Sequence, residues 1–289
     1  MSRRLSFGWI RRSVAWVLIV GCAWQPLSAL TLRLERAEPH DLEISGGLAG
    51  VPAGESRFAS WAALRTLSPR RVVLDGEFVP GPQEVTIIDL ARLWQALPVE
   101  PRRDTLLAWC TDGFLAVYRR DEVEALRPFV VLEINGRGPG QWPPEGLAFN
   151  PGPYAIGVDR TLAPAVADLL SETSKKPWGV ARVEFVRYAE AFAPLLALNL
   201  SEPARQGREV WLQRCVSCHE GPPGTVGGTK AARPFALLSA QAAGAPDFFL
   251  RYVKNPRSIN PAATMEANES LDVGLIEAVR RFLAEGGTP

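Results

Sequence analysis

Hydrophobic and polar positions follow different patterns in two parts of the chain. Between residues 30 and 198, short apolar runs rich in β-branched residues alternate with brief amphipathic stretches, which is typical of strands connected by short helices. The predicted strands span 71–74, 85–88, 105–109, 129–134 and 180–186, and the predicted helices span 90–97 and 121–126. This part is therefore predicted to be an α+β domain with a mixed or antiparallel sheet.

Apolar residues after position 199 follow helical spacing instead. One stripe predicts a helix over 204–214 and comprises Ala204, Gly207, Val210 and Trp211. A second stripe over 275–283 predicts a C-terminal helix with Ser270 as its N-cap. Because glycine destabilises a helix by about 1 kcal/mol relative to alanine, Gly207 is expected where the C-terminal helix crosses closely, with Phe282 beside it.

The two patterns meet at 195–203. Ser201 is the predicted N-cap of the helix that begins there. The expected organisation is thus two domains, an α+β domain over 30–198 and an all-α domain over 199–289.

The first 29 residues have the composition of a secretory signal. Four arginines and no acidic residue accompany an apolar run over 14–20, and small residues follow near Ala29. The run is shorter than the ~20 apolar residues that cross a bilayer, so we expect cleavage and a periplasmic mature chain. Two alternatives imply association with a membrane: an uncleaved anchor, and a lipoprotein acylated at Cys22.

Charge argues against nucleic acid as a partner. The whole chain carries a formal charge of +1, and without the four arginines of the predicted signal the remainder carries −3. Binding to nucleic acid needs a basic surplus gathered on one face, which this composition does not provide.

The strongest chemical signal is Cys215-Val-Ser-Cys218-His219, the C-x-x-C-H motif of covalent haem c attachment. The two thiols add to the vinyl groups of the haem as thioethers, and their spacing places both on one side of a helical turn. The next residue, His219, then reaches the iron. One covalently bound haem c is therefore the predicted cofactor.

The motif has three other interpretations. A zinc site needs two further Cys or His ligands, and His40 and Cys110 are both remote in sequence. A thioredoxin-like redox pair follows a strand, whereas this motif follows a predicted helix. The third alternative is chance occurrence, against which the flanking sequence argues.

Those flanks carry a family resemblance. Met265, the only methionine besides the initiator, lies in a proline-rich loop ahead of the C-terminal helix. With Gly207-x-x-x-Trp211, the C-x-x-C-H motif and Tyr252-Val-Lys-Asn-Pro256, it makes residues 199–289 resemble class I c-type cytochromes.

The resemblance implies roles for individual residues. His219 would be the proximal iron ligand and Met265 the distal one, whose soft thioether favours Fe(II). Pro222 or Pro223 would orient the imidazole through a backbone carbonyl, and Trp211 would pack beside the site. The family often has proline where this chain has Glu266, so His40 or an open, water-occupied position stays an alternative for the sixth ligand.

The segments 88–94, 110–114 and 128–129 resemble, more faintly, the molybdopterin-binding domain of sulfite-oxidase-like proteins. In that family the molybdenum-ligating cysteine lies well before the Asp-Gly-aromatic segment, and here no cysteine of the mature chain precedes Cys110. We therefore expect no molybdenum function, Cys110 in the core, Asp112 in a turn and His40 exposed.

Together these features predict an exported monohaem c-type cytochrome that passes single electrons between a protein donor and a protein acceptor. An electron carrier is favoured over an enzyme. The main alternative is the haem-bearing subunit of a periplasmic oxidoreductase, whose N-terminal domain binds the substrate or a catalytic partner. A ligand sensor, in which a gas displaces Met265, is the third hypothesis.

Overall fold

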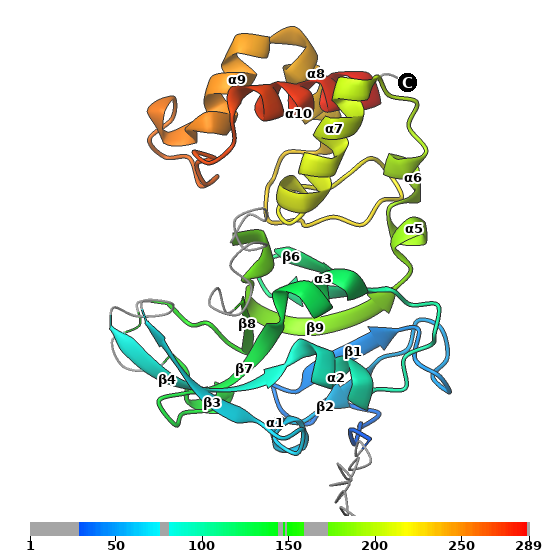
Figure 1. The fold of residues 1–289 in the computed structure, drawn as a ribbon, viewed down its shortest axis with the longest axis vertical. Helices are drawn as coiled ribbons and strands as arrows, with labels where there is room; N and C mark the ends of the chain where they lie inside the picture. Colours follow the sequence, from blue (N-terminus) through cyan, green and yellow to red (C-terminus); the bar gives the residue numbers. More distant parts are fainter. Residues whose placement is uncertain (1–28, 76–80, 144–146, 148, 159–172, 288–289) are drawn as a thin grey trace, which may run out of the picture.

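The computed structural model of the chain describes residues 29–75, 81–143, 147, 149–158 and 173–287 (Figure 1). The predicted signal, with Cys22, lies outside these residues except for Ala29. Within the described ranges, none of the helices has the length and apolar character that crossing a membrane requires.

The described residues form one nine-stranded mixed sheet. Its strands are β1 (Leu42–Gly46), β2 (Arg57–Ala59), β3 (Arg70–Asp75), β4 (Pro82–Asp89), β5 (Thr105–Cys110), β6 (Leu115–Arg119), β7 (Pro128–Ile134), β8 (Tyr154–Val158) and β9 (Trp178–Val186). Seven strands follow the order β2-β1-β9-β8-β7-β4-β3, and the β5–β6 hairpin joins the sheet through β9. Only the β1–β9 pair among these strands is parallel.

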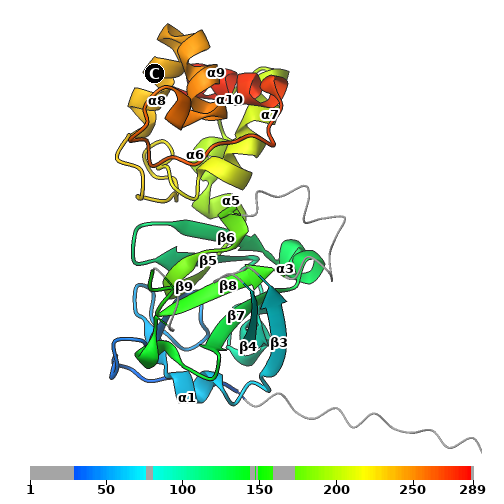
Figure 2. The same ribbon diagram turned by 90° about the vertical axis from the view of Figure 1, so that its left-hand side faces the viewer.

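Helices accompany the sheet and follow it. In chain order they are α1 (Trp61–Leu64), α2 (Leu90–Ala96), α3 (Arg120–Leu126), α5 (Tyr188–Ala191), α6 (Ala193–Leu196), α7 (Glu202–Val210), α8 (Phe235–Gly244), α9 (Pro246–Lys254) and α10 (Val273–Gly286). Short turns are η1 (Pro139–Gln141), η2 (Thr173–Lys175), the π-helical η3 (Trp211–Cys215) and η4 (Pro256–Ser258). In Figure 2, α7 to α10 stand beyond the β5–β6 hairpin, and α5 and α6 form the connection.

The β5–β6 hairpin is buried on both faces. Leu106 and Tyr118 belong to the core of the sheet, whereas Leu107, Leu115 and Val117 pack with the helices in a second core. Because side chains of a strand alternate between its faces, the near-continuous apolar run of β5 reflects two cores, one on each side.

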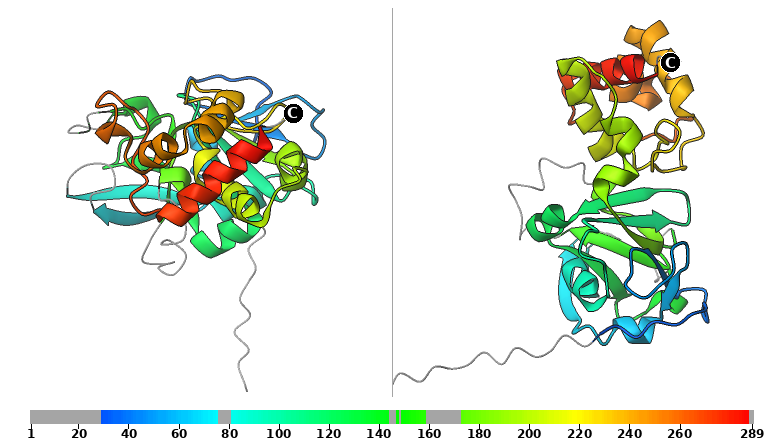
Figure 3. Two further views of the ribbon diagram at one scale, coloured as in Figure 1. Left: turned by 90° about the horizontal axis from the view of Figure 1, so that it is seen from above. Right: turned by 90° about the vertical axis from the view of Figure 1, so that its right-hand side faces the viewer.

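The helical core continues from this hairpin into the C-terminal helices. Trp211, Phe235 and Phe282 form its aromatic centre, with ring centroids 5.8 to 5.9 Å apart. Figure 3 shows α7 and α10 crossing above the sheet. Gly207 lies at this crossing, as predicted, because a Cβ there would stand 1.9 Å from the Ala278 carbonyl oxygen.

The predicted division into an α+β domain and a separate all-α domain is wrong. The described residues form a mixed α/β fold with a nine-stranded sheet, and the C-terminal helices bury their apolar faces against the second face of β5 and β6. The prediction is wrong because it assumed that the strand-like and the helix-like parts of the sequence each form a separate hydrophobic core.

Local predictions were more accurate than the domain prediction. All five predicted strands and both predicted short helices are present. Ser201 caps α7, and its side chain accepts a hydrogen bond from Ala204 N. The cap of α10 is Asp272 rather than Ser270, because the Asp272 carboxylate accepts from Leu275 N at 2.8 Å.

Candidate functional site

The C-x-x-C-H residues occupy one turn at the end of a helix. After α7 the chain widens into the π-helical turn η3, closed by the bond from Val216 N to Trp211 O at 2.9 Å. The Cys215 carbonyl then accepts from Cys218 N at 3.1 Å and from His219 N at 2.9 Å. The structure thus brings both thiols and the imidazole into one turn, as the spacing predicts.

Backbone hydrogen bonds hold this turn against the sheet. The Ser217 carbonyl accepts from Leu115 N at 2.8 Å, and Thr229 N donates to the Gly113 carbonyl at 2.8 Å. Both partners belong to the β5–β6 hairpin, so the motif is anchored by the sheet as well as by its own helix. Close packing requires Gly228, where a Cβ would stand 2.0 Å from the Ser217 oxygen.

A cavity of about 300 Å³ opens beside the turn. Cys215 and His219 line it, and so does Met265, fifty residues away along the chain. Its apolar wall comes from α8, α9 and α10, with Leu238, Phe249, Tyr252, Val279 and Leu283, and from Leu271 just before α10. The structure therefore gathers the predicted proximal and distal ligands around one largely apolar space.

Burial sets the protonation state of the motif. It raises the pKa of the Cys215 thiol to about 12 and also raises that of Cys218. The pKa of His219 is lowered, first by burial and then by the nearby charge of Arg233. At neutral pH the thiols are therefore protonated and the imidazole is neutral. Neutral imidazole is the form that binds a metal, whereas a reactive redox cysteine needs a lowered pKa.

Of the residues expected to support His219, Trp211 packs beside it, whereas Pro222 makes no hydrogen bond to it. Trp211 is buried, and its ring centroid lies 5.7 Å from that of His219. The Pro222 carbonyl accepts from Thr225 N at 3.0 Å, whereas His219 Nδ1 is buried without a hydrogen-bond partner. The structure does not form the bond between them that the resemblance implies.

The remaining sequence candidates lie outside the cavity lining. Cys110 is buried in the core of the sheet as predicted, and burial raises the pKa of its thiol to about 12. Asp112 accepts from Phe114 N in the hairpin turn and pairs with Lys230 at 2.8 Å. His40, expected to be exposed, is half-buried beside Gly140 and does not reach the cavity lined by His219.

Sequence reasoning missed the polar rim of the cavity. Lys230 and Arg233 line it from the segment between the motif and α8. The Arg233 guanidinium lies over the Tyr252 ring, 5.5 Å from its centroid. Two cations in a loop with no recognisable motif give no signal in a single sequence, because only the fold brings them to the cavity.

No protein-family model matches the chain, and no curated protein matches it in sequence. Within the described residues, no group of three or more His, Cys, Asp or Glu is placed to hold a metal ion.

These findings contradict the predicted family resemblances. Residues 199–289 are not a separate class I cytochrome c domain, because they share a core with a nine-stranded sheet. Neither that family nor the molybdopterin-binding family is found. The family patterns were short, and the sequence could not show that the helical segment is completed by strands from elsewhere in the chain.

The residues around the cavity nevertheless suit a haem without reference to any family. The half-buried imidazole of His219 lines the cavity, two protonated thiols stand in the same turn, and a thioether lines the same apolar space. A haem iron takes four ligands from the porphyrin and needs only one or two from the protein, so no cluster of three protein ligands is required.

Proposed function

We propose that the chain carries one covalently attached haem c and transfers single electrons between a protein donor and a protein acceptor. Cys215 and Cys218 would form the thioethers, and His219 and Met265 would be the axial ligands. The observation that carries this proposal is the shared cavity, which Cys215, His219 and Met265 all line.

A bound haem supplies a one-electron iron couple. The chain's own residues hold the group, exclude water and fix its ligands. The apolar wall that includes Phe249 and Leu271 favours an apolar macrocycle over water. Met265 would occupy the sixth position, so that electrons rather than small ligands are exchanged at the site.

We further propose that the chain is exported to the periplasm. The proposal rests on the arginine-rich, apolar N-terminal residues, and thioether attachment is consistent with a site outside the cytoplasm. Whether Cys22 is acylated, removed or kept in an anchor decides whether the protein associates with a membrane.

The test is expression of the full chain in a bacterium that matures c-type haem in its periplasm. We expect one haem that survives acid–acetone extraction and denaturing electrophoresis, with a low-spin spectrum after reduction. The double variant Cys215→Ala/Cys218→Ala should lose covalent haem completely. Cys110→Ala is the matched control, because it removes a buried thiol outside the cavity and should keep the haem.

The identity of the sixth ligand needs its own variant. Met265→Ala should abolish the weak long-wavelength band that a thioether gives to oxidised haem and should allow carbon monoxide to bind after reduction. If the unmodified chain accumulates folded in the periplasm without covalent haem, the proposal is wrong. If it binds haem but lacks the thioether band, only the role of Met265 is wrong.

The hydrogen bonds between the Cys215–His219 turn and the β5–β6 hairpin favour one second candidate. They place Leu115 N and Gly113 O in direct contact with the motif or its neighbouring loop. In a haem-bearing subunit of an oxidoreductase, whose sheet would bind a catalytic partner, these bonds would connect the sheet to the haem turn. Purification of a stable complex that contains a second cofactor would distinguish it from a freely exchanging carrier.

A further inference from the structure

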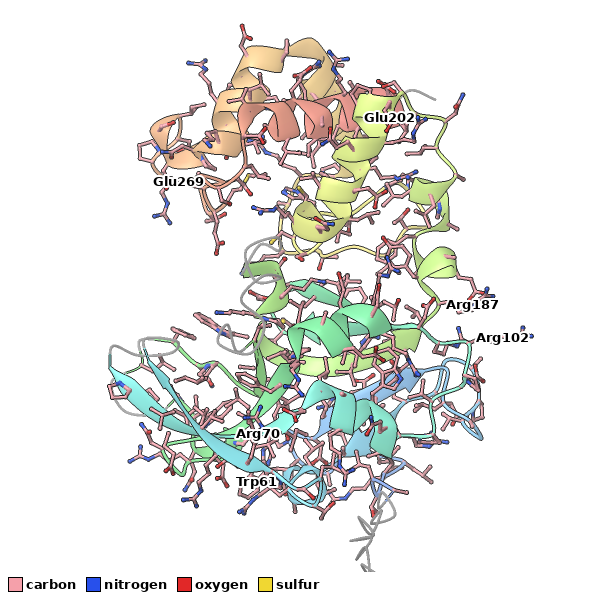
Figure 4. All side chains as sticks on the ribbon, viewed as in Figure 1. Trp61, Arg70, Arg102, Arg187, Glu202 and Glu269 are labelled. Atoms are coloured by element: carbon pink, nitrogen blue, oxygen red, sulfur yellow. The ribbon has the colours of Figure 1, made fainter. Side chains whose placement is uncertain are left out.

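The segment that presents Met265 has little secondary structure of its own. It runs from η4 to α10, and on its N-terminal side Ala263 N closes a turn by donating to Asn260 O at 2.9 Å. Figure 4 labels Glu269 on its C-terminal side, at the left of the helical part. Met265 therefore lies between this short turn and residues 268–271, and the contacts of residues 268–271 determine how firmly the segment is held.

Lys254, in the last turn of α9, fixes that second end. Its ammonium donates to the Glu269 carbonyl at 2.7 Å and to the Leu271 carbonyl at 2.6 Å. The position favours a cation, because the C-terminus of a helix carries partial negative charge. Two of the three N–H donors of the ammonium are thus used on the backbone of one loop.

Asn268 ties the same loop to the same helix end. Its backbone N donates to the Lys254 carbonyl at 3.2 Å, and its side-chain Nδ2 donates to the Val253 carbonyl at 3.2 Å. Nδ2 also lies 3.4 Å from the Glu266 carbonyl, one residue after Met265. Asn268 lines the cavity together with Met265, so the anchored part of the loop begins three residues from the thioether.

From this geometry we infer that Lys254 and Asn268 are positioning residues, which hold Met265 at the cavity and so determine whether the thioether occupies the sixth position of the iron. The inference rests on the proposed haem function. Hydrogen bonds involving a charged group contribute more than neutral ones, so the Lys254 ammonium is the principal anchor and Asn268 the secondary one.

The principal test is Lys254→Met in the full, haem-loaded chain. Methionine keeps the aliphatic stem and removes the donors. We expect the long-wavelength thioether band of the oxidised protein to be lost, the midpoint potential to fall because the soft ligand no longer favours Fe(II), and carbon monoxide to bind after reduction. Lys254→Arg should restore the band at least in part, because it keeps charge and donors.

Arg251→Met is the matched control. Arg251 is exposed in the same last turn of α9, and the substitution removes the same charge without touching the loop. The band and the potential should stay as in the unmodified protein. If Arg251→Met lowers the potential as much as Lys254→Met does, the effect is one of net charge and the inference is wrong.

Asn268→Ala provides an independent readout if Lys254→Met does not accumulate. We expect a weaker band and faster hydrogen exchange confined to residues 259–271. A Lys254 or Asn268 variant that folds with an unchanged band and potential overturns the inference while leaving haem attachment intact. A parent chain without covalent haem overturns the proposed function instead, so the two failures are distinguishable.

Discussion

The two faces of the β5–β6 hairpin carry different cores. The face with Leu106 and Tyr118 packs within the sheet-rich part, together with residues of β1, α2 and β9. The face with Leu107 and Val117 packs against helices that follow much later in the chain. The candidate haem site therefore depends on a strand pair that the sequence pattern assigns to the other predicted domain, and we expect the two regions to unfold together.

Truncation of one fully buried phenylalanine in each core tests that dependence. Phe282 and Phe185 are both fully buried, and each Phe→Ala change should cost about 3–5 kcal/mol of the free energy of unfolding. In urea titrations, tryptophan fluorescence and haem absorbance should report one coincident transition, lowered by either variant. Two separate transitions, each sensitive to only one variant, would contradict a shared cooperative unit.

Leu107→Ala and Leu106→Ala form a closer pair on adjacent positions of β5. Both side chains are fully buried, so each variant should lose about 2–5 kcal/mol of stability. Only Leu107 faces the helical core, and only its truncation should broaden the haem spectrum or raise carbon monoxide binding at a denaturant concentration where both variants stay folded. Equal spectral changes in the two variants would show that the haem site does not depend on which face of β5 loses its side chain.

Gly207→Ala should weaken the crossing of α7 and α10. The new Cβ meets the Ala278 carbonyl at 1.9 Å, and overpacking of this kind costs about 1–3 kcal/mol. Gly244→Ala is the control, since a Cβ at the end of α8 has no atom within 4 Å. Thermal melts should therefore show a lower midpoint for the Gly207 variant only.

The smallest effect concerns acid stability. Hydrogen bonds from Arg280, with further help from Arg281, lower the pKa of Glu277 from 4.5 to about 2. A lowered folded-state pKa adds stability above the unfolded-state pKa, and this contribution is lost as pH falls from about 4.5 to about 2. Glu277→Gln should thus cost at most about 1 kcal/mol at pH 7 for this partly exposed pair, and the cost should vanish near pH 2.

The sequence predicted local structure better than assembly. Periodicity located β5, β9 and α2, and motif spacing located Cys215, Cys218 and His219, because these depend on neighbours in the chain. It did not predict that Leu115 N would bind the Ser217 carbonyl or that Lys254 would anchor the Met265 loop. The first contact joins residues about a hundred positions apart and the second joins residues 15 positions apart. Neither pair has a sequence pattern that identifies its partner.

The π-helical turn η3 has a consequence for helical phase. The bond from Val216 N to Trp211 O encloses one more residue than a regular turn. Every residue after Trp211 therefore occupies a direction that a regular helix would assign to its predecessor. Regular α-helical winding over 211–216 with no residue removed would therefore rotate Cys215 and His219 away from the cavity by about 100°. Deletion of one residue within 212–214 would instead restore the ordinary period and keep both side chains in their present directions.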